Sequence, residues 1–320
     1  MSQPGFPQFA DVLAAAARIA PHAQVTPVLR SRTLDALTGA QLHFKCENLQ
    51  RTGAFKFRGA CNAVWSLPAH EAAAGVVTHS SGNHGAALAL AARTRGIAAH
   101  VVVPDGAVAS KLAAIEAFGA TLHRCAPTMA AREAMAAQVQ MRSGARLVHP
   151  FTDPLVIAGQ GTAALELLAE IGVLDCVLVP VGGGGLAAGT ALAVAGPSDM
   201  ARATRVIGVE PEGAADAHES LRRGVRVTDV QPETVCDGLR GTIGELNLAM
   251  LRAQRVEVLL VSDEQTLAAM RLLWERLKLL VEPSSATVLA ALLRYPERFA
   301  GQRVGVLLSG GNADLAALLR

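Results

Sequence analysis

Short apolar runs alternate with longer alanine-rich stretches over most of the chain. Apolar runs of this length are typical of strands buried on both faces of a parallel sheet, and the stretches between them are long enough for covering helices. The pattern therefore predicts an α/β protein built on parallel sheets. The predicted strands are residues 41–46, 76–79, 100–103, 121–125, 146–149, 176–181, 205–210 and 304–308. The predicted helices include residues 57–66, 85–95, 107–118, 129–142, 159–171, 186–194, 263–279 and 284–293.

The domain organisation is only weakly marked, because the chain has no internal repeat and no low-complexity linker. Residues 70–150 nevertheless contain a complete alternation of strands and helices of their own. We therefore expect a small domain at 70–150, inserted into a large domain that is made of residues 1–69 and 151–320.

Composition excludes several classes of protein. Apolar residues make up 51% and charged residues 18%, against a typical ~25% charged, so the chain is not disordered and should bury a large core. The net charge of +2 gives no sign of a basic surface for nucleic acid or an anionic membrane, and 3% aromatic residues are few for stacking on bases. The five cysteines form no CxxC pair, which is typical of reduced, cytosolic proteins.

One uncharged stretch, residues 176–198, is long enough to span a bilayer. Pro180 and a run of four glycines interrupt it, so a buried strand, a glycine loop and a helix explain it better than a membrane span. Residues 1–10 lack the basic start and apolar core of a signal peptide. We expect a soluble, cytoplasmic protein that does not contact a membrane.

Lysine is scarce, and this limits the candidates for amine chemistry. The chain has four lysines, and Lys56 stands between Phe55 and Phe57 at the predicted start of a helix. Partial desolvation and the positive helix end would both lower its pKa, as covalent chemistry with a carbonyl requires. The alternative is an ordinary surface lysine that lays its methylenes along apolar surface.

Two loops at the carboxyl ends of predicted strands have the composition of anion sites. Residues 78–85 are polar or glycine throughout, so hydroxyl, amide and backbone N–H donors could hold a carboxylate. A capped turn is the alternative, but eight such residues in a row exceed what a cap needs and favour a site. Residues 182–185 are four glycines between a strand and a helix, which predicts a phosphate cradle. No Walker motif follows, so the phosphate would belong to a cofactor other than a nucleotide.

Two further loops carry weaker signals. Residues 308–312 form a polar, glycine-containing loop at another predicted strand end, where open α/β sheets bind ligands. Residues 210–216 bring Glu210, Glu212 and Asp216 into one short loop, which could hold Mg²⁺ or Ca²⁺ through oxygen ligands. A solvated acidic loop is the alternative interpretation.

Together these motifs resemble the fold-type II pyridoxal-phosphate family, and in particular its branch of serine racemases and serine/threonine dehydratases. The resemblance covers residues 26–315 and rests on Phe55-Lys56, the run 80–85, the glycine loop and the run 309–312, in this order. It implies two parallel-sheet domains of the tryptophan synthase β-subunit-like fold, with the cofactor in the interdomain cleft. The large domain would bind the cofactor and the small domain the substrate.

The resemblance also implies roles for individual residues. Lys56 would bind pyridoxal phosphate covalently and act as a base, and Ser81 would act on the opposite face of the cofactor ring. The other cofactor-binding residues would be Phe55, Asn83, Gly182, Gly183, Gly184, Gly185, Gly238 and Ser309. The substrate-binding residues would be Ser80, Ser81, Asn83, His84 and Arg132. Glu210, Ala214 (through its carbonyl) and Asp216 match the family's divalent-metal positions, so Mg²⁺ or Ca²⁺ is expected as a second cofactor.

These roles favour elimination over other pyridoxal-phosphate chemistry. A neutral Ser309 at the pyridine nitrogen would make the cofactor a moderate electron sink, which favours quick loss of a β-hydroxyl. We therefore expect dehydration and deamination of L-threonine or L-serine to a 2-oxo acid and ammonia. Because Ser81 would face Lys56 across the substrate, a proton could return from the other side, and racemase side activity is expected.

Alternatives remain at this stage. The enzyme could be chiefly a serine racemase. Arg132 matches an arginine that contacts a second carboxylate in related enzymes, which favours a 3-hydroxyaspartate dehydratase. A sensor that binds a phosphate ligand without catalysis would use the same scaffold. The expected partners are a small amino-acid substrate and a second copy of the chain in a homodimer, with no nucleic acid.

Overall fold

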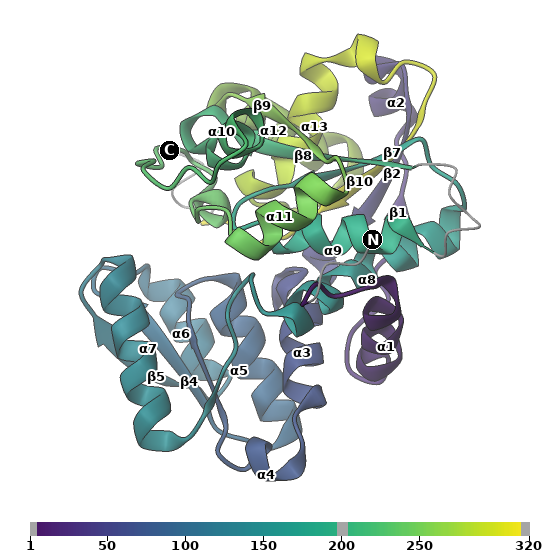
Figure 1. Ribbon diagram of the computed structural model, residues 1–320. Coiled ribbons are helices and arrows are strands. Elements are labelled where there is room, and N and C mark those ends of the chain that lie inside the picture. The colour runs from purple at the N-terminus through teal and green to yellow at the C-terminus, as the bar shows by residue number, and fades with distance from the viewer. Residues whose placement is uncertain (1–4, 197–203, 315–320) are drawn as a thin grey trace.

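The computed structural model describes residues 5–196 and 204–314 and contains two sheets (Figure 1). The large sheet has six strands in the order β1-β2-β10-β7-β8-β9, and the small sheet has four in the order β5-β4-β3-β6. The strands of the large sheet are β1 (Val28–Leu29), β2 (Gln41–Cys46), β7 (Cys176–Pro180), β8 (Arg205–Pro211), β9 (Glu257–Val261) and β10 (Arg303–Leu308). Those of the small sheet are β3 (Val76–His79), β4 (Ala99–Pro104), β5 (Thr121–Cys125) and β6 (Arg146–Leu147). All neighbours pair in parallel except β1, which is antiparallel to β2.

Helices cover both faces of each sheet. One core of the large sheet lies under α2 (Arg32–Thr38), α12 (Asp263–Leu277) and α13 (Pro283–Arg294), and another lies under α8 (Pro154–Ile171), α9 (Gly185–Ala195) and α11 (Glu245–Ala253). The small sheet packs against α5 (Asn83–Arg95), with α3 (Lys56–Ser66) and α6 (Ala109–Ala117) in the same core, and against α7 (Met129–Ser143) on its other face. The remaining α-helices are α1 (Phe9–Ile19), α4 (Ala69–Ala72) and α10 (Asp216–Arg223).

The predicted α/β fold with two parallel-sheet units is confirmed, with one correction. The large sheet is not wholly parallel, because the two-residue strand β1 returns antiparallel along its edge. All strands of the small sheet come from residues 76–147. The domain limits at residues 70 and 150 stay a prediction.

One helix start was predicted too late. The sequence predicts a helix from residue 159, whereas α8 begins at Pro154. The side chain of Asp153 accepts a hydrogen bond from the amide of Leu155 (2.8 Å), and proline fits the first turn because it has no N–H to satisfy there.

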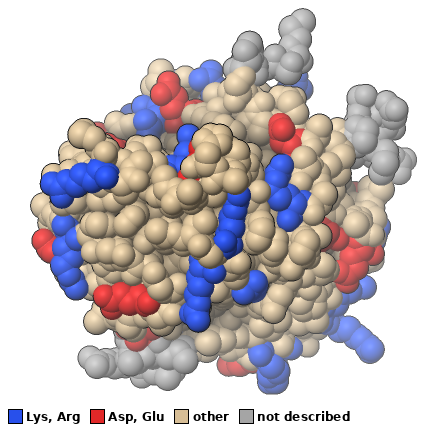
Figure 2. Space-filling view, turned by 90° about the horizontal axis from the view of Figure 1, so that it is seen from below, with Lys and Arg blue, Asp and Glu red and all other residues tan. Residues whose placement is uncertain are grey.

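By length and composition, α8 is also the one described helix that could cross a membrane. In the fold, 56% of this 18-residue helix is buried, and it packs against α1, α3 and α9. A core helix passes the same test, so the test gives little support for a membrane span. On the face shown in Figure 2, acidic and basic side chains are dispersed over a largely uncharged surface.

A buried ion-pair cluster fixes α3 against the large sheet. The guanidinium of Arg58 pairs with Glu47 (2.7 Å) and with Glu166 of α8 (2.7 Å), and Lys45 of β2 pairs with Glu166 (2.6 Å). Arg58, Lys45 and Glu47 are completely buried. Removing one partner of such a cluster leaves an uncompensated buried charge, which typically costs about 3–5 kcal/mol. The cluster therefore holds the first turns of α3, including Lys56, in one position.

Candidate active site

The four lysines have different surroundings. Lys45 is buried in the ion-pair cluster, Lys111 pairs with Asp237, and Lys278 is exposed. Lys56 differs from these three because it is half-buried and makes no ion pair with any described residue. Of the lysines, it is the one whose amine is available in a sheltered position.

Lys56 is the first residue of α3, and its amine is held at the inner end of a half-buried side chain. Its Nζ donates a hydrogen bond to the carbonyl of Pro150 (2.8 Å) and lies 5.1 Å from the centre of the Phe55 ring. Burial lowers the pKa of Lys56 to about 8, and the carboxylate of Glu282 opposes this shift. A larger share of the amine is therefore neutral near pH 8 than for an exposed lysine, as attack on a carbonyl requires.

Residues 80–82 join β3 to α5, and together with the first residues of α5 they present donors to the same region. No side chain caps α5 at Gly82, so the first amides of the helix stay available to an anion. Ser80, Ser81 and Asn83 are half-buried, whereas His84 is buried and its Nε2 bonds to the carbonyl of Val148 (3.3 Å). The side chain of His84 therefore ties the loop to the chain near Pro150, and its predicted contact with substrate stays a prediction.

Asn83 belongs to a polar network that the sequence did not reveal. Its amide donates to both carboxylate oxygens of Glu282 (3.1 Å each) and accepts from Asn312 (2.9 Å). Burial raises the pKa of Glu282 to about 7, with the hydrogen bond from Asn83 opposing it. Glu282 stands at the N-cap position of α13, but its side chain makes no capping hydrogen bond there. Its carboxylate binds Asn83 instead.

The glycine loop, residues 182–185, has no room for side chains. A Cβ at Gly182 would lie 2.9 Å from the backbone of Leu239, and one at Gly183 would lie 2.4 Å from the Phe151 ring. Gly184 has a φ of +85°, where side chains are also strained. Among the described residues, the amides of the first three glycines donate to no other group, so they can serve an anion at the start of α9.

Gly238 and Ser309 lie at the same end of the large sheet. The amide of Gly238 donates to the hydroxyl of Ser284 (3.0 Å), and a Cβ at Gly238 would lie 2.9 Å from that oxygen. Ser309 is buried directly after β10, and its carbonyl accepts from the amide of Phe55 (3.0 Å). The structure therefore brings Ser309 next to the residue that precedes Lys56.

Arg132 stands apart from this group of contacts. It lies on α7, half-buried, and its Nε is buried without a hydrogen-bond partner among the described residues. Its charge helps to lower the pKa of His79, although burial contributes more. His79 stacks edge-on with His149 (5.0 Å), and His149 with Phe151 (4.6 Å), so a row of rings connects the neighbourhood of Arg132 with the glycine loop.

The predicted metal residues lie together at the end of β8. Glu210 accepts from the amides of Ala217 (3.1 Å) and His218 (2.8 Å), and Asp216 accepts from that of Ile243 (2.7 Å). Both carboxylates are buried, and burial raises the pKa of each, to about 6 for Asp216. The charge of Asp216 raises the pKa of Glu210 further. Ala214 is buried in the same turn.

No described group of three or more His, Cys, Asp and Glu side chains has metal-binding geometry. Glu210 and Asp216 supply only two carboxylates, and the third ligand implied by the resemblance is a carbonyl oxygen. Two buried, mutually repelling carboxylates do suit a divalent cation with oxygen ligands. The metal site stays a prediction.

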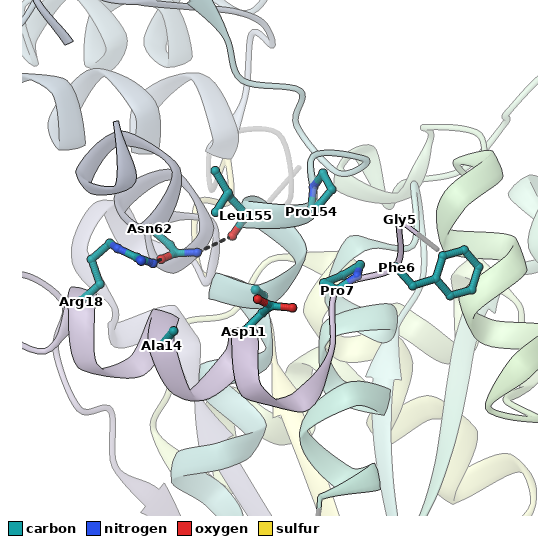
Figure 3. Close-up of a pocket in the computed structure, with 10 residues that line it drawn as sticks. Gly5, Phe6, Pro7, Asp11, Ala14, Arg18, Asn62, Pro154 and Leu155 are labelled. Carbon is teal, nitrogen blue, oxygen red and sulfur yellow. Dashed lines mark hydrogen bonds between the residues drawn. The ribbon is translucent and has the colours of Figure 1, made fainter. Parts of the chain in front are cut away.

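A separate surface cavity of about 260 Å³ lies between α1 and the start of α8 (Figure 3). Arg18 and Asn62 hydrogen-bond to each other beside it (2.5 Å), and Asn62 also donates to the carbonyl of Leu155 (2.7 Å). None of its lining residues belongs to the predicted site. We therefore assign it no part in the chemistry.

The family follows from comparison with known proteins. The family model described as "Pyridoxal-phosphate dependent enzyme" matches residues 19–310. The chain belongs to this family. It is 47% identical to the "beta-hydroxyaspartate dehydratase" of Paracoccus denitrificans, over 98% of each chain. The solved structure of maize serine racemase gives a TM-score of 0.94 at 40% identity, covering 98% of this chain and 96% of that chain. The crystal structure of a threonine deaminase from T.th. gives a TM-score of 0.89 at 45% identity, covering 96% of this chain and 99% of that chain.

The site fits the cofactor of the pyridoxal-phosphate family. This cofactor carries an aldehyde and a phosphate, so it needs an available amine and an anion cradle in one site. Lys56 supplies the amine, and the unpaired amides of the glycine loop supply the cradle. Phe55, Asn83, Gly238 and Ser309 lie on segments that contact one another around these two groups. Their individual roles stay predictions.

Proposed function

We propose that this member of the pyridoxal-phosphate family dehydrates and deaminates a β-hydroxy amino acid. The β-hydroxyl leaves as water, one water is taken up when the amino group leaves as ammonia, and the net products are a 2-oxo acid and ammonia. The half-buried Lys56 with its lowered pKa, close to a helix start that has no side-chain cap, is the observation that carries the proposal. The similarity to a beta-hydroxyaspartate dehydratase and a threonine deaminase supports it.

Different residues of the chain bind the substrate and transfer its proton. The first amides of α5, together with Ser80, Ser81 and Asn83, bind and orient the substrate carboxylate. When bound, the cofactor accepts the electrons released when the Cα proton leaves. Lys56 takes that proton as a neutral amine, and its low pKa keeps it suited to proton transfer near neutral pH.

We further propose that 3-hydroxyaspartate is a better substrate than L-serine or L-threonine. A guanidinium nitrogen that is buried without a partner costs free energy unless an anion binds it, and Arg132 has such a nitrogen on the side of the small sheet. The second carboxylate of 3-hydroxyaspartate is an anion of the required kind. The similarity to a beta-hydroxyaspartate dehydratase points the same way.

Substrate preference is tested by product analysis over L- and D-serine, L-threonine and the isomers of 3-hydroxyaspartate. Arg132→Met should lower kcat/KM for 3-hydroxyaspartate about 10- to 100-fold, because a hydrogen bond to a charged group contributes about 1.5–3 kcal/mol. It should change the values for serine and threonine much less. Arg142→Met, at the far end of α7 and exposed, is the matched control. An equal loss for all substrates would show that Arg132 acts only on the fold.

A racemase is the second candidate. The fold is close to that of maize serine racemase, and Ser81 lies in the loop at the start of α5. The ratio of epimerised substrate to 2-oxo acid decides between the two activities. Cytoplasmic location, a homodimer and a bound divalent cation remain predictions to be tested separately.

A further inference from the structure

Asn247 of α11 is a buried amide whose position links two parts of the site. It is completely buried, and its Nδ2 donates to the carbonyls of Phe151 (2.8 Å) and Gly183 (2.5 Å). Both acceptors are carbonyl oxygens, so the NH₂ end of the amide must face them. No loop motif or composition marked this residue in the sequence.

The two acceptors belong to the two segments that must hold the cofactor at its ends. Gly183 is in the middle of the glycine loop, and Phe151 follows Pro150, whose carbonyl accepts from the amine of Lys56 (2.8 Å). The side chain of Asn247 therefore connects the phosphate cradle to the segment that orients the lysine. The amide of Gly244, just before α11, also donates to the carbonyl of Gly183 (3.1 Å).

The two hydrogen bonds from Asn247 come with a cost in folding free energy. The Oδ1 of Asn247 is buried and has no hydrogen-bond partner among the described residues. A buried unsatisfied acceptor typically costs about 1–3 kcal/mol, and an apolar side chain of similar volume would avoid that cost. If the side chain at position 247 only filled space, an amide would not be needed there. An amide is needed to donate to the backbone carbonyls of Phe151 and Gly183.

We propose that Asn247 is a positioning residue that fixes the separation between the glycine loop and Lys56. The amides of the glycine loop are then placed to bind the phosphate of the cofactor while the aldehyde of the same cofactor lies at the amine of Lys56. Binding of the phosphate and binding of the aldehyde therefore reinforce each other in the wild-type protein. The proposal rests on the cofactor of the family and not on the proposed substrate.

The experiment compares the affinities of the cofactor-free protein for pyridoxal phosphate and for pyridoxal, which lacks the phosphate. Both are measured by absorbance titration with no substrate present. In Asn247→Leu, the advantage of pyridoxal phosphate over pyridoxal should fall about tenfold or more, as expected for about 1.4 kcal/mol of lost coupling. Because the measured quantity is a ratio, a uniform loss of stability does not change it.

Asn62→Leu is the matched control. Asn62 is also completely buried, and its amide donates to a backbone carbonyl of α8 (2.7 Å), outside the site. This variant should lower the melting temperature and leave the ratio unchanged. If Asn247→Leu does not fold, Asn247→Ser, which leaves a shorter donor, should show the same fall in the ratio. A ratio within about twofold of wild type in the folded Asn247 variant would overturn the proposal, whatever the enzyme's substrate.

Discussion

We expect Ser81 to be the side chain that separates elimination from racemisation. It is half-buried in the loop before α5, and its hydroxyl makes no hydrogen bond to a described residue, so it is available to a bound substrate. Elimination from an L-substrate needs Lys56 to take the Cα proton and a proton for the departing hydroxyl, but none from the Ser81 side, whereas racemisation needs a proton donor on that opposite side. We expect Ser81→Ala to keep measurable dehydration of L-substrates while epimerisation falls by about 10²–10⁴-fold.

The measurement is chiral chromatography of residual substrate, run together with an assay of the 2-oxo acid. Use of D-serine should fall with epimerisation, because its proton must leave on the Ser81 side. Ser80→Ala is the comparison, since Ser80 would bind the carboxylate and its loss should weaken both reactions alike. If Ser81→Ala also weakens both reactions equally, Ser81 only binds substrate.

Local composition marks some site residues and not others. The lysine between two phenylalanines, the glycine run and the polar loop before α5 are visible in the sequence, because each is concentrated in a few adjacent positions. Glu282 and Asn247 act through partners far away in the chain, Asn83 for the first and Gly183 for the second. A buried polar side chain whose partner lies on another element has no local pattern, so only the structure shows it.

At the level of elements, the end of β8 and the start of α10 form the predicted cation site. In the folded protein the pKa values of Glu210 and Asp216 are raised, so the folded state holds their protons more strongly than the unfolded state does. For Asp216 this favourable contribution is present at low pH and is lost as pH rises from near 3.8 to about 6. A bound cation would relieve the repulsion between the two ionised carboxylates.

We therefore expect Mg²⁺ or Ca²⁺ to raise the melting temperature more at about pH 7.5 than at about pH 5, where protons compete for the carboxylates. A cation at about 100 times its Kd would add about 2.7 kcal/mol. Asp216→Asn should abolish this gain. Glu212→Gln should not, because Glu212 is exposed and pairs with Arg294 (2.5 Å). No response to cation or chelator at either pH would favour a cation-free acidic turn.

Three strands were predicted to the residue, whereas two strands of the large sheet were missed. The bounds of β2, β3 and β5 agree with the prediction, because each is a short run between turn residues. β1 and β9 were not predicted, and both are edge strands of the large sheet. β1 has only two residues, too few to give a strand pattern, and Glu257 interrupts the apolar residues at the start of β9.

At the scale of the whole molecule, the site depends on how the two sheets face each other. Asn83 reaches Glu282 from the small-sheet side, and Lys111 of α6 pairs with Asp237 of the large-sheet side. Glu282 also responds to both charges, since Asp237 raises its pKa and Lys111 lowers it. The ion pair between Lys111 and Asp237 therefore holds α6 close to the polar network of the site.

We expect Lys111→Met to loosen the contact between the two sheet units with little loss of stability, because an exposed ion pair contributes only about 0–1 kcal/mol. KM for the amino-acid substrate should rise about 2- to 5-fold, and amide hydrogen exchange in α6 should quicken. Raising ionic strength should reproduce part of the effect in the wild type and none in the variant, since salt screens partly exposed pairs. Arg298→Met, which breaks the exposed pair with Glu257 within the large-sheet unit (2.6 Å), is the control. An unchanged KM with unchanged exchange in α6 would show that the pair does not hold α6 against the large-sheet unit.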